Sequence, residues 1–182
     1  MRRAALLLLL LPAVSGCFWR DHAPTQRGTL YSPNGEPLSG GRLGHPSCAD
    51  ALGRWFERVD ANHDGAIDRN EFLADAARQF ALMDLDKDGV LTPAELAQYR
   101  APYAEAPQVE EAPAQDDERR RELRPTRAGP ERPDPVMLAD TGLHNRVTRE
   151  EFLAFASRTF AGLDADHDGR VTRAELTALC RT

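Results

Sequence analysis

Three stretches of this sequence place oxygen-bearing side chains at alternate positions around a glycine. The first runs from Asp60 to Glu71, with such side chains at its first, third, fifth, ninth and twelfth positions and glycine at its sixth. Carboxylates and carboxamides in this spacing wrap a hard cation, and the glycine permits the sharp turn between them. The pattern begins again at Asp84 and at Asp164, and three occurrences in register are not explained by chance.

Each stretch predicts a calcium site built from five side chains and the backbone carbonyl of the seventh position. Magnesium fits less well, because it demands a small octahedral shell rather than seven flexible oxygens. The predicted ligands are Asp60, Asn62, Asp64, Ala66, Asp68 and Glu71 in loop 1; Asp84, Asp86, Asp88, Val90, Thr92 and Glu95 in loop 2; and Asp164, Asp166, Asp168, Arg170, Thr172 and Glu175 in loop 4.

These motifs resemble the EF-hand superfamily, over residues 48–100 and 136–181, and in particular the small exported EF-hand proteins of bacteria. The resemblance implies an all-α fold of helix-loop-helix repeats with Ca²⁺ as the bound ion. The ends of the loops also favour helix starts. Asp68, Thr92 and Thr172 each precede a glutamate by three residues, which is the capping-box spacing.

The second half of the chain repeats the first at an offset of 80 residues, and its loops begin 24 residues apart in both halves. That spacing leaves room for only one helix between loops, so helices 71–83 and 151–163 must be shared. Packed antiparallel in one domain, they would bring loop 1 to loop 4 and loop 2 to loop 3. Short β-ladders are then expected between position-eight residues, pairing Ile67 with Val171 and Leu91 with Val147.

Loop 3, from Asp140 to Glu151, has lost part of the pattern. It has Gly142 at the third position, His144 at the fifth and Asn145 at the sixth. We therefore predict a structural loop that survives as the partner of loop 2 and does not bind calcium. Two interpretations of His144 stay open, a transition-metal ligand or a solvent-facing histidine.

The N-terminal residues predict export. Residues 1–16 have the two arginines, the short apolar core and the small residues of a signal peptide. Cys17 directly follows Val-Ser-Gly, which resembles the bacterial lipoprotein box and implies cleavage before Cys17 and lipidation of it; a plain secretory signal is the alternative. Phe18, where an aspartate would imply inner-membrane retention, points to the outer membrane of a Gram-negative cell, facing the periplasm.

The remaining segments complete the expected organisation. Residues 17–47 would form the lipidated N-terminus and a flexible tether, residues 48–100 hands 1 and 2, and residues 136–182 hands 3 and 4. Residues 101–135, with seven prolines, read as a charged linker. Cys48 and Cys180 form a disulfide in an oxidising periplasm or remain two separate buried thiols.

Composition limits the function. The net charge of −6, near −8 without Arg2 and Arg3, favours cations and argues against nucleic acid. No catalytic constellation is recognisable, so we expect a non-catalytic lipoprotein that buffers calcium or is stabilised or switched by it. The mature chain has only Met83 and Met137, which favours a buffer or structural role over a sensor. The alternative is a calcium-rigidified docking module resembling dockerins, although the predicted entering helix (Leu52–Val59) counts against it; a protein partner stays unidentified.

Overall fold

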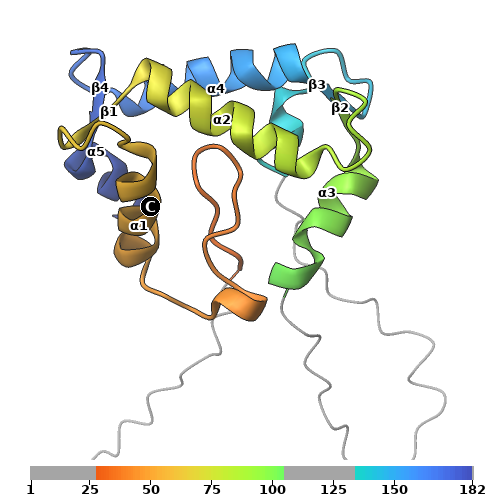
Figure 1. Ribbon diagram of the computed structural model, residues 1–182, viewed down its shortest axis with the longest axis horizontal. Coiled ribbons are helices and arrows are strands. Elements are labelled where there is room, and N and C mark those ends of the chain that lie inside the picture. The colour runs from red at the N-terminus through yellow and green to blue at the C-terminus, as the bar shows by residue number, and fades with distance from the viewer. Residues whose placement is uncertain (1–27, 105–133, 182) are drawn as a thin grey trace, which may run out of the picture.

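The computed structural model describes residues 28–104 and 134–181 (Figure 1). Its helices are α1 (Cys48–Val59), α2 (Arg69–Met83), α3 (Pro93–Arg100), α4 (Arg149–Leu163) and α5 (Arg173–Ala178). Its strands are β1 (Ala66–Asp68), β2 (Val90–Leu91), β3 (Val147–Thr148) and β4 (Arg170–Thr172), and its 3-10 turns are η1 (Gly41–Leu43), η2 (Ala101–Tyr103), η4 (Met137–Ala139) and η5 (Leu179–Arg181). None of the described helices has the length and apolar character needed to cross a bilayer. The expected signal peptide, Cys17 and most of the linker lie outside the described residues.

The helices begin at side-chain caps, which include the three predicted capping boxes. Ser47 accepts a hydrogen bond from the backbone N–H of Asp50 at the start of α1. The other helices begin with complete capping boxes, formed by Asp68, Thr92, Thr148 and Thr172 with the glutamate three residues later. Each box satisfies two backbone N–H groups that the helix itself leaves unpaired.

Helices α2 and α4 pack against each other at the centre of the molecule, as predicted (Figure 1). Phe72 lies edge-on to Phe160, with ring centroids 5.5 Å apart, and Phe80 lies 5.6 Å from Phe152. The 80-residue repeat makes Phe72 equivalent to Phe152 and Phe80 to Phe160, so the two contacts are related by a pseudo-twofold axis. Burying each such ring contributes about 1.5–3 kcal/mol to the free energy of unfolding.

The shared helices hold the loops at opposite ends, and the ladders form across the two halves. β1 pairs antiparallel with β4, and Ile67 lies opposite Val171. β2 pairs with β3, and Leu91 lies opposite Val147. All four of these side chains are fully buried. Both predicted pairings, and with them the all-α EF-hand architecture, are confirmed.

The first and last helices lie side by side at one end of the molecule (Figure 1). Cys48 and Cys180 are joined there by a disulfide, with their Cα atoms 5.7 Å apart. Of the two alternatives left open by the sequence, the structure therefore contains the cross-link and not two separate thiols. The bond closes a loop with a sequence separation of 132 residues.

The prediction of a flexible tether over residues 17–47 is wrong for residues 28–47. Tyr31 bridges Pro37, and the N–H of Gly35 donates to the carbonyl of Ser32, which makes a tight hairpin. Gly35 has a φ of +79°, a conformation that glycine adopts without strain. Pro33 and Asn34 precede it in the turn, and this local turn chemistry outweighs the high content of Gly, Pro, Ser and Arg that led us to expect a tether. We call residues 30–39 the N-terminal hairpin.

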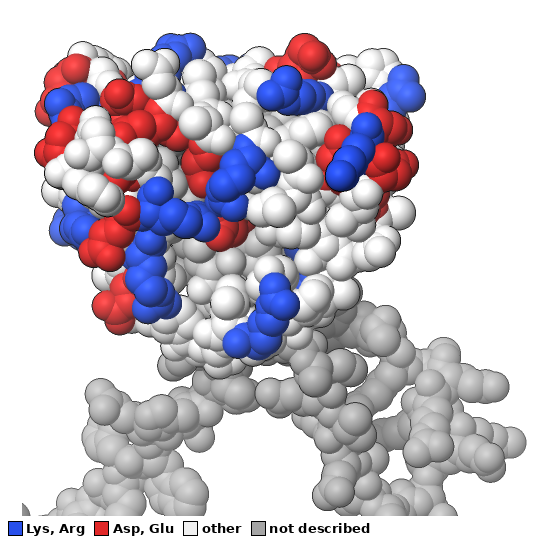
Figure 2. Space-filling view, viewed as in Figure 1, with Lys and Arg blue, Asp and Glu red and all other residues white. Residues whose placement is uncertain are grey.

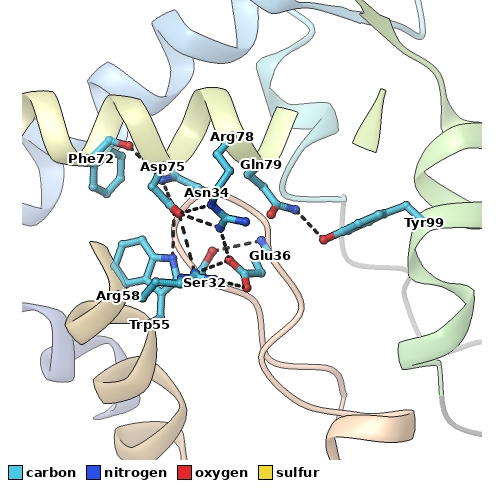
Figure 3. Close-up of polar contacts among 10 residues, drawn as sticks. All are labelled: Ser32, Asn34, Glu36, Trp55, Arg58, Phe72, Asp75, Arg78, Gln79 and Tyr99. Carbon is cyan, nitrogen blue, oxygen red and sulfur yellow. Dashed lines mark hydrogen bonds and ion pairs between the residues drawn. The ribbon is translucent and has the colours of Figure 1, made fainter. Parts of the chain in front are cut away.

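The N-terminal hairpin lies beneath α2, between α1 and α3 (Figure 1), and polar contacts hold it there (Figure 3). Asn34 is 2% exposed, and its side-chain amide donates to the carbonyl of Phe72 and to Asp75 Oδ2, at 3.2 and 2.9 Å. Trp55 Nε1 donates to the same Asp75 oxygen at 3.1 Å. The buried Asp75 carboxylate therefore joins the hairpin to both α1 and α2.

Charged groups close the outer edge of this contact. Glu36 accepts hydrogen bonds from Arg58 of α1 and from Arg78 of α2, and Arg78 also donates to Asp75 (Figure 3). Both arginine side chains are about two-fifths exposed, so each pair contributes only modestly to stability. Together they fix the hairpin in one register against the helices.

The beginning of the predicted linker also packs on the domain. The turn η2 contacts η1, and a Cβ on Gly40 or Gly41 would overlap the backbone of Pro102 and Tyr103. Arg100 forms an ion pair with Asp134 and lies over the ring of Tyr31. The linker boundary at residue 101 is therefore too early, and residues 105–133 lie outside the described part.

Replacing Gly35 by alanine tests the hairpin. A Cβ there would lie 2.6 Å from Val136 Cγ2, and the positive φ adds strain. We expect the free energy of unfolding to fall by about 1–3 kcal/mol, measured by urea denaturation. Gly28→Ala is the matched control, because nothing lies within 4 Å of a Cβ at Gly28. Equal stability of the two variants would contradict the packed hairpin.

Candidate metal centres

The four loops share one backbone conformation. Residues at the fourth position have a positive φ between 54° and 63°, namely His63, Lys87, Leu143 and His167. Those at the sixth position are also left-handed, namely Gly65, Gly89, Asn145 and Gly169. Non-glycine residues rarely adopt this conformation, so its recurrence is a property of the loop design. Loop 3 keeps this backbone conformation although it has lost two of the ligand side chains.

Acidic side chains gather at the two ends of the α2–α4 pair, where the loops lie (Figures 1 and 2). One end carries loops 1 and 4, and the other carries loops 2 and 3, because the ladders join them in those pairs. Lys and Arg side chains cover part of the face between these ends (Figure 2). The molecule therefore presents two separate acidic regions, each with two loops.

The aspartate at the first position of each calcium loop is buried and held by the backbone. Asp164 accepts from the N–H of Asp168 at 3.1 Å and from that of Gly169 at 3.0 Å, and Asp60 accepts in the same way within loop 1. Asp84 Oδ2 accepts from Gly89, but its buried Oδ1 has no hydrogen-bond partner among the described residues. A buried carboxylate oxygen without a donor is costly, and a cation would satisfy it.

The twelfth-position glutamates reach back across their loops. Glu71 Oε1 accepts from the N–H of Ala61, and the same atom of Glu95 and Glu175 accepts from Leu85 and Ala165, at 2.8–3.0 Å. The other oxygen accepts from the backbone of the ninth residue. Each carboxylate therefore lies between the start and the end of its loop, where both oxygens can face one ion.

Donor atoms converge in loops 2 and 4. Oxygens of Asp84, Asp86 and Glu95 lie within 4.8 Å of one another, and so do those of Asp164, Asp166 and Asp168. Of the other predicted ligands, Asp88 accepts from the N–H of Val90, and the ninth-position side chains Asp68, Thr92 and Thr172 cap the following helices. The seventh-position residues Ala66, Val90 and Arg170 begin strands β1, β2 and β4. These donors fit a calcium ion in both loops.

Loop 1 has a competitor for its fifth-position ligand. Arg170 of loop 4 places Nη2 2.5 Å from Asp64 Oδ1, and the amide of Asn62 donates to Asp64 Oδ2 at 3.1 Å. Asp64 is not part of a three-residue cluster like those of loops 2 and 4 among the described residues. The guanidinium competes with a calcium ion for the Asp64 carboxylate, so we expect loop 1 to bind calcium more weakly than loops 2 and 4. The loop sequence alone did not reveal this contact, which the β1–β4 ladder creates.

Capping hydrogen bonds also set the pKa of the twelfth-position carboxylates. A backbone hydrogen bond from Thr172, together with one from its hydroxyl, lowers the pKa of Glu175 below its ordinary 4.5. The backbone and the hydroxyl of Thr148 likewise lower the pKa of Glu151. A pKa depressed in the folded state stabilises the fold above the unfolded value, and this contribution is lost as pH falls through the folded value.

The metal-free protein should therefore lose stability in acid. We expect the melting temperature in chelator to be level above pH 4.5 and to fall progressively below it, with a shallower fall in Glu175→Gln. Thermal melts between pH 7 and pH 3 measure this. A wild-type melting temperature that did not change over that range would contradict the role given to the caps.

The family model described as EF hand matches residues 52–74, 77–98 and 157–179. These ranges contain loops 1, 2 and 4, the three with the full ligand pattern, whereas loop 3 lies outside them. With the loop geometry above, the matches show that the chain belongs to the EF-hand superfamily of calcium-binding domains, which are typically non-catalytic. No curated protein matches the chain.

Proposed function

We propose that this protein is an exported, non-catalytic lipoprotein that binds three calcium ions and uses them to stabilise its fold or to buffer calcium. The observation that carries the calcium part is the buried Asp84 oxygen without a hydrogen-bond donor among the described residues, in a loop where oxygens of Asp84, Asp86 and Glu95 lie within 4.8 Å of one another. Binding a cation there satisfies that oxygen and neutralises the repulsion among the clustered carboxylates.

The N-terminal hairpin supports a structural or buffering role rather than a sensing one. A sensor EF-hand opens on binding calcium and exposes an apolar, Met-rich groove. Here the hairpin already lies against α1 and α2 and is held by Asn34 and Glu36 (Figure 3). Opening of these helices would break the buried contacts of Asp75. The N-terminal hairpin therefore already covers the surface that an opening of α1 and α2 would expose. Met83, one of the few methionines, is fully buried.

Calorimetry combined with a dye that reports exposed apolar surface tests this function. We expect calcium to bind with heat while the dye fluorescence stays unchanged. A rise in fluorescence on binding would overturn the structural role in favour of a sensor. No heat at millimolar calcium would overturn the calcium function itself.

The export and anchoring part rests on residues 1–17 and is supported by the Cys48–Cys180 disulfide, because such bonds persist in oxidising compartments. Several acyl chains on Cys17 would anchor the protein firmly in the membrane, since each buried methylene contributes about 0.8 kcal/mol. Expression of the full chain in a Gram-negative host should place it in the outer-membrane fraction, and Cys17→Ser should release it from that fraction. Equal fractionation of the two proteins would exclude the lipid anchor.

A further inference from the structure

Loop 3 carries a different set of donors from the calcium loops. Ligand atoms of Asp140, His144 and Glu151 all lie within 4.8 Å of one another, and they come from the end of η4, the loop itself and the first turn of α4. We propose that loop 3 is a site for a divalent transition-metal ion of the zinc class, held by two carboxylates and one imidazole. This site is additional to the three calcium ions and does not depend on them.

Loop 3 departs from the calcium pattern at its third and fifth positions, and the two changes are sterically complementary. The third position is Gly142, and a Cβ at that residue would overlap the imidazole of His144. The imidazole ring therefore occupies the space that a side chain at the third position would fill, and it lies toward the carboxylate of the first position. If the two calcium ligands had been lost independently, the residue that replaced one would not need to make space for the residue that replaced the other. The glycine removes one oxygen ligand and makes the space in which a nitrogen ligand fits.

The carboxylates are held as they are in the calcium loops. Asp140 accepts from the N–H of His144 at 3.1 Å and from that of Asn145 at 2.7 Å, which matches the bonds to Asp164 in loop 4. Glu151 accepts from Thr148 at 2.9 Å and from the hydroxyl of Thr141 at 3.4 Å. Leu91–Val147 pairing and a bond from the N–H of Arg149 to the carbonyl of Gly89 fix the loop backbone. The donors are therefore arranged without an ion.

The ligand atoms of His144 and Asp140 lie somewhat farther apart than two ligands of one zinc ion. Its Nδ1 lies 3.9 Å from Asp140 Oδ1, too far for a hydrogen bond. Two ligands on one tetrahedral zinc ion lie roughly 3.3 Å apart, since each is about 2.0–2.1 Å from the metal. A small rotation of the exposed ring closes this difference. The His144 side chain is 62% exposed, so water can complete the shell.

Chemistry also separates the two metals. Calcium takes six to eight oxygens, and loop 3 lacks side-chain oxygens at its third and fifth positions. Imidazole suits zinc, copper, nickel and iron, and zinc accepts mixed nitrogen and carboxylate sets. Loop 3 therefore favours a borderline transition metal where its neighbour, loop 2, favours calcium.

Calorimetric titration of Zn²⁺ into the full chain, saturated with calcium, tests the site. We expect wild type to bind one zinc ion through loop 3 and His144→Ala to bind it at least tenfold more weakly. His167→Ala is the matched control, because His167 occupies the fourth position of loop 4, and it should bind zinc as wild type does. Loss of zinc binding in His144→Ala but not in His167→Ala supports the site.

Two outcomes of the zinc titration would overturn the proposal. One is absence of zinc binding to the calcium-saturated wild type, and the other is equal zinc affinity of wild type and His144→Ala. A double variant, Gly142→Asp with His144→Asp, restores the lost oxygens and should bind a fourth calcium ion in place of zinc. Four calcium ions bound by the wild type would instead make loop 3 a calcium site. The number of calcium ions bound by loops 1, 2 and 4 is measured in a separate titration. A negative result for zinc therefore leaves the proposed calcium function intact.

Discussion

Glu95→Gln is expected to remove one calcium ion, the ion in loop 2, from those that the protein binds tightly. Glutamine keeps an oxygen that can accept from Leu85 or Thr92, so the helix cap survives. It loses the charge and the second oxygen that a twelfth-position glutamate supplies to calcium. We expect the affinity of loop 2 to fall at least about tenfold, or about 1.4 kcal/mol. Calorimetry gives both the affinity and the stoichiometry.

The degenerate loop provides a matched control for this prediction. Glu151 occupies the same position in loop 3 and makes the same capping bonds to its threonine. Glu151→Gln should leave the calcium stoichiometry unchanged, because loop 3 lacks two of the oxygens that calcium requires. If both variants lost one calcium ion, the assignment of loop 3 as a loop that does not bind calcium would be wrong.

The arrangement of the loops followed from the sequence because it depends on one length. Twenty-four residues between loop starts allow a single helix, and a rigid helix separates the loops at its ends. Pairing across the two halves is then the remaining way to bury Ile67, Leu91, Val147 and Val171. The prediction needed no side-chain detail, and the repeat supplied its symmetry.

The N-terminal hairpin was missed because composition was given more weight than local turn chemistry. Pro33, Asn34 and Gly35 form a strong turn signal between Tyr31 and Leu38. A second signal lay in the repeat itself. Asp75 and Gln79 stand where the equivalent helix has Phe155 and Thr159, and a buried carboxylate in only one copy requires a partner outside the repeat. Asn34 is that partner, together with Trp55.

The contact of Arg170 with Asp64 could not be read from either loop alone. It depends on the register of β1 against β4, in which Asp68 lies opposite Arg170. Sequence patterns identify ligands within a loop, but they do not show which side chain of a neighbouring loop approaches them. Differences in affinity among otherwise equivalent loops are set at this level.

Removing the disulfide by Cys48→Ser with Cys180→Ser is expected to lower the free energy of unfolding by about 3–5 kcal/mol. The bond joins residues 132 positions apart, and a long closed loop restricts the unfolded chain strongly. Urea denaturation of the calcium-free protein measures the loss. Wild type treated with reductant should match the double variant, and reductant should not change the variant further. A difference below about 1 kcal/mol would show that the bond adds little.

The same cross-link should also affect loop 4. Helix α5 has six residues and a single buried side chain, Leu176, and so short a helix is not stable by itself. Its contacts with α1 include the exposed Arg173–Glu57 pair, which contributes little. Glu175, the twelfth-position ligand of loop 4, lies on this helix. Reduction of the disulfide should therefore weaken calcium binding at loop 4 more than at loop 2. The helix that follows loop 4 is tied to α1 through Cys180 in η5, whereas α3, which follows loop 2, contains no cysteine. Equal weakening of both loops would show that the disulfide stabilises the domain only as a whole.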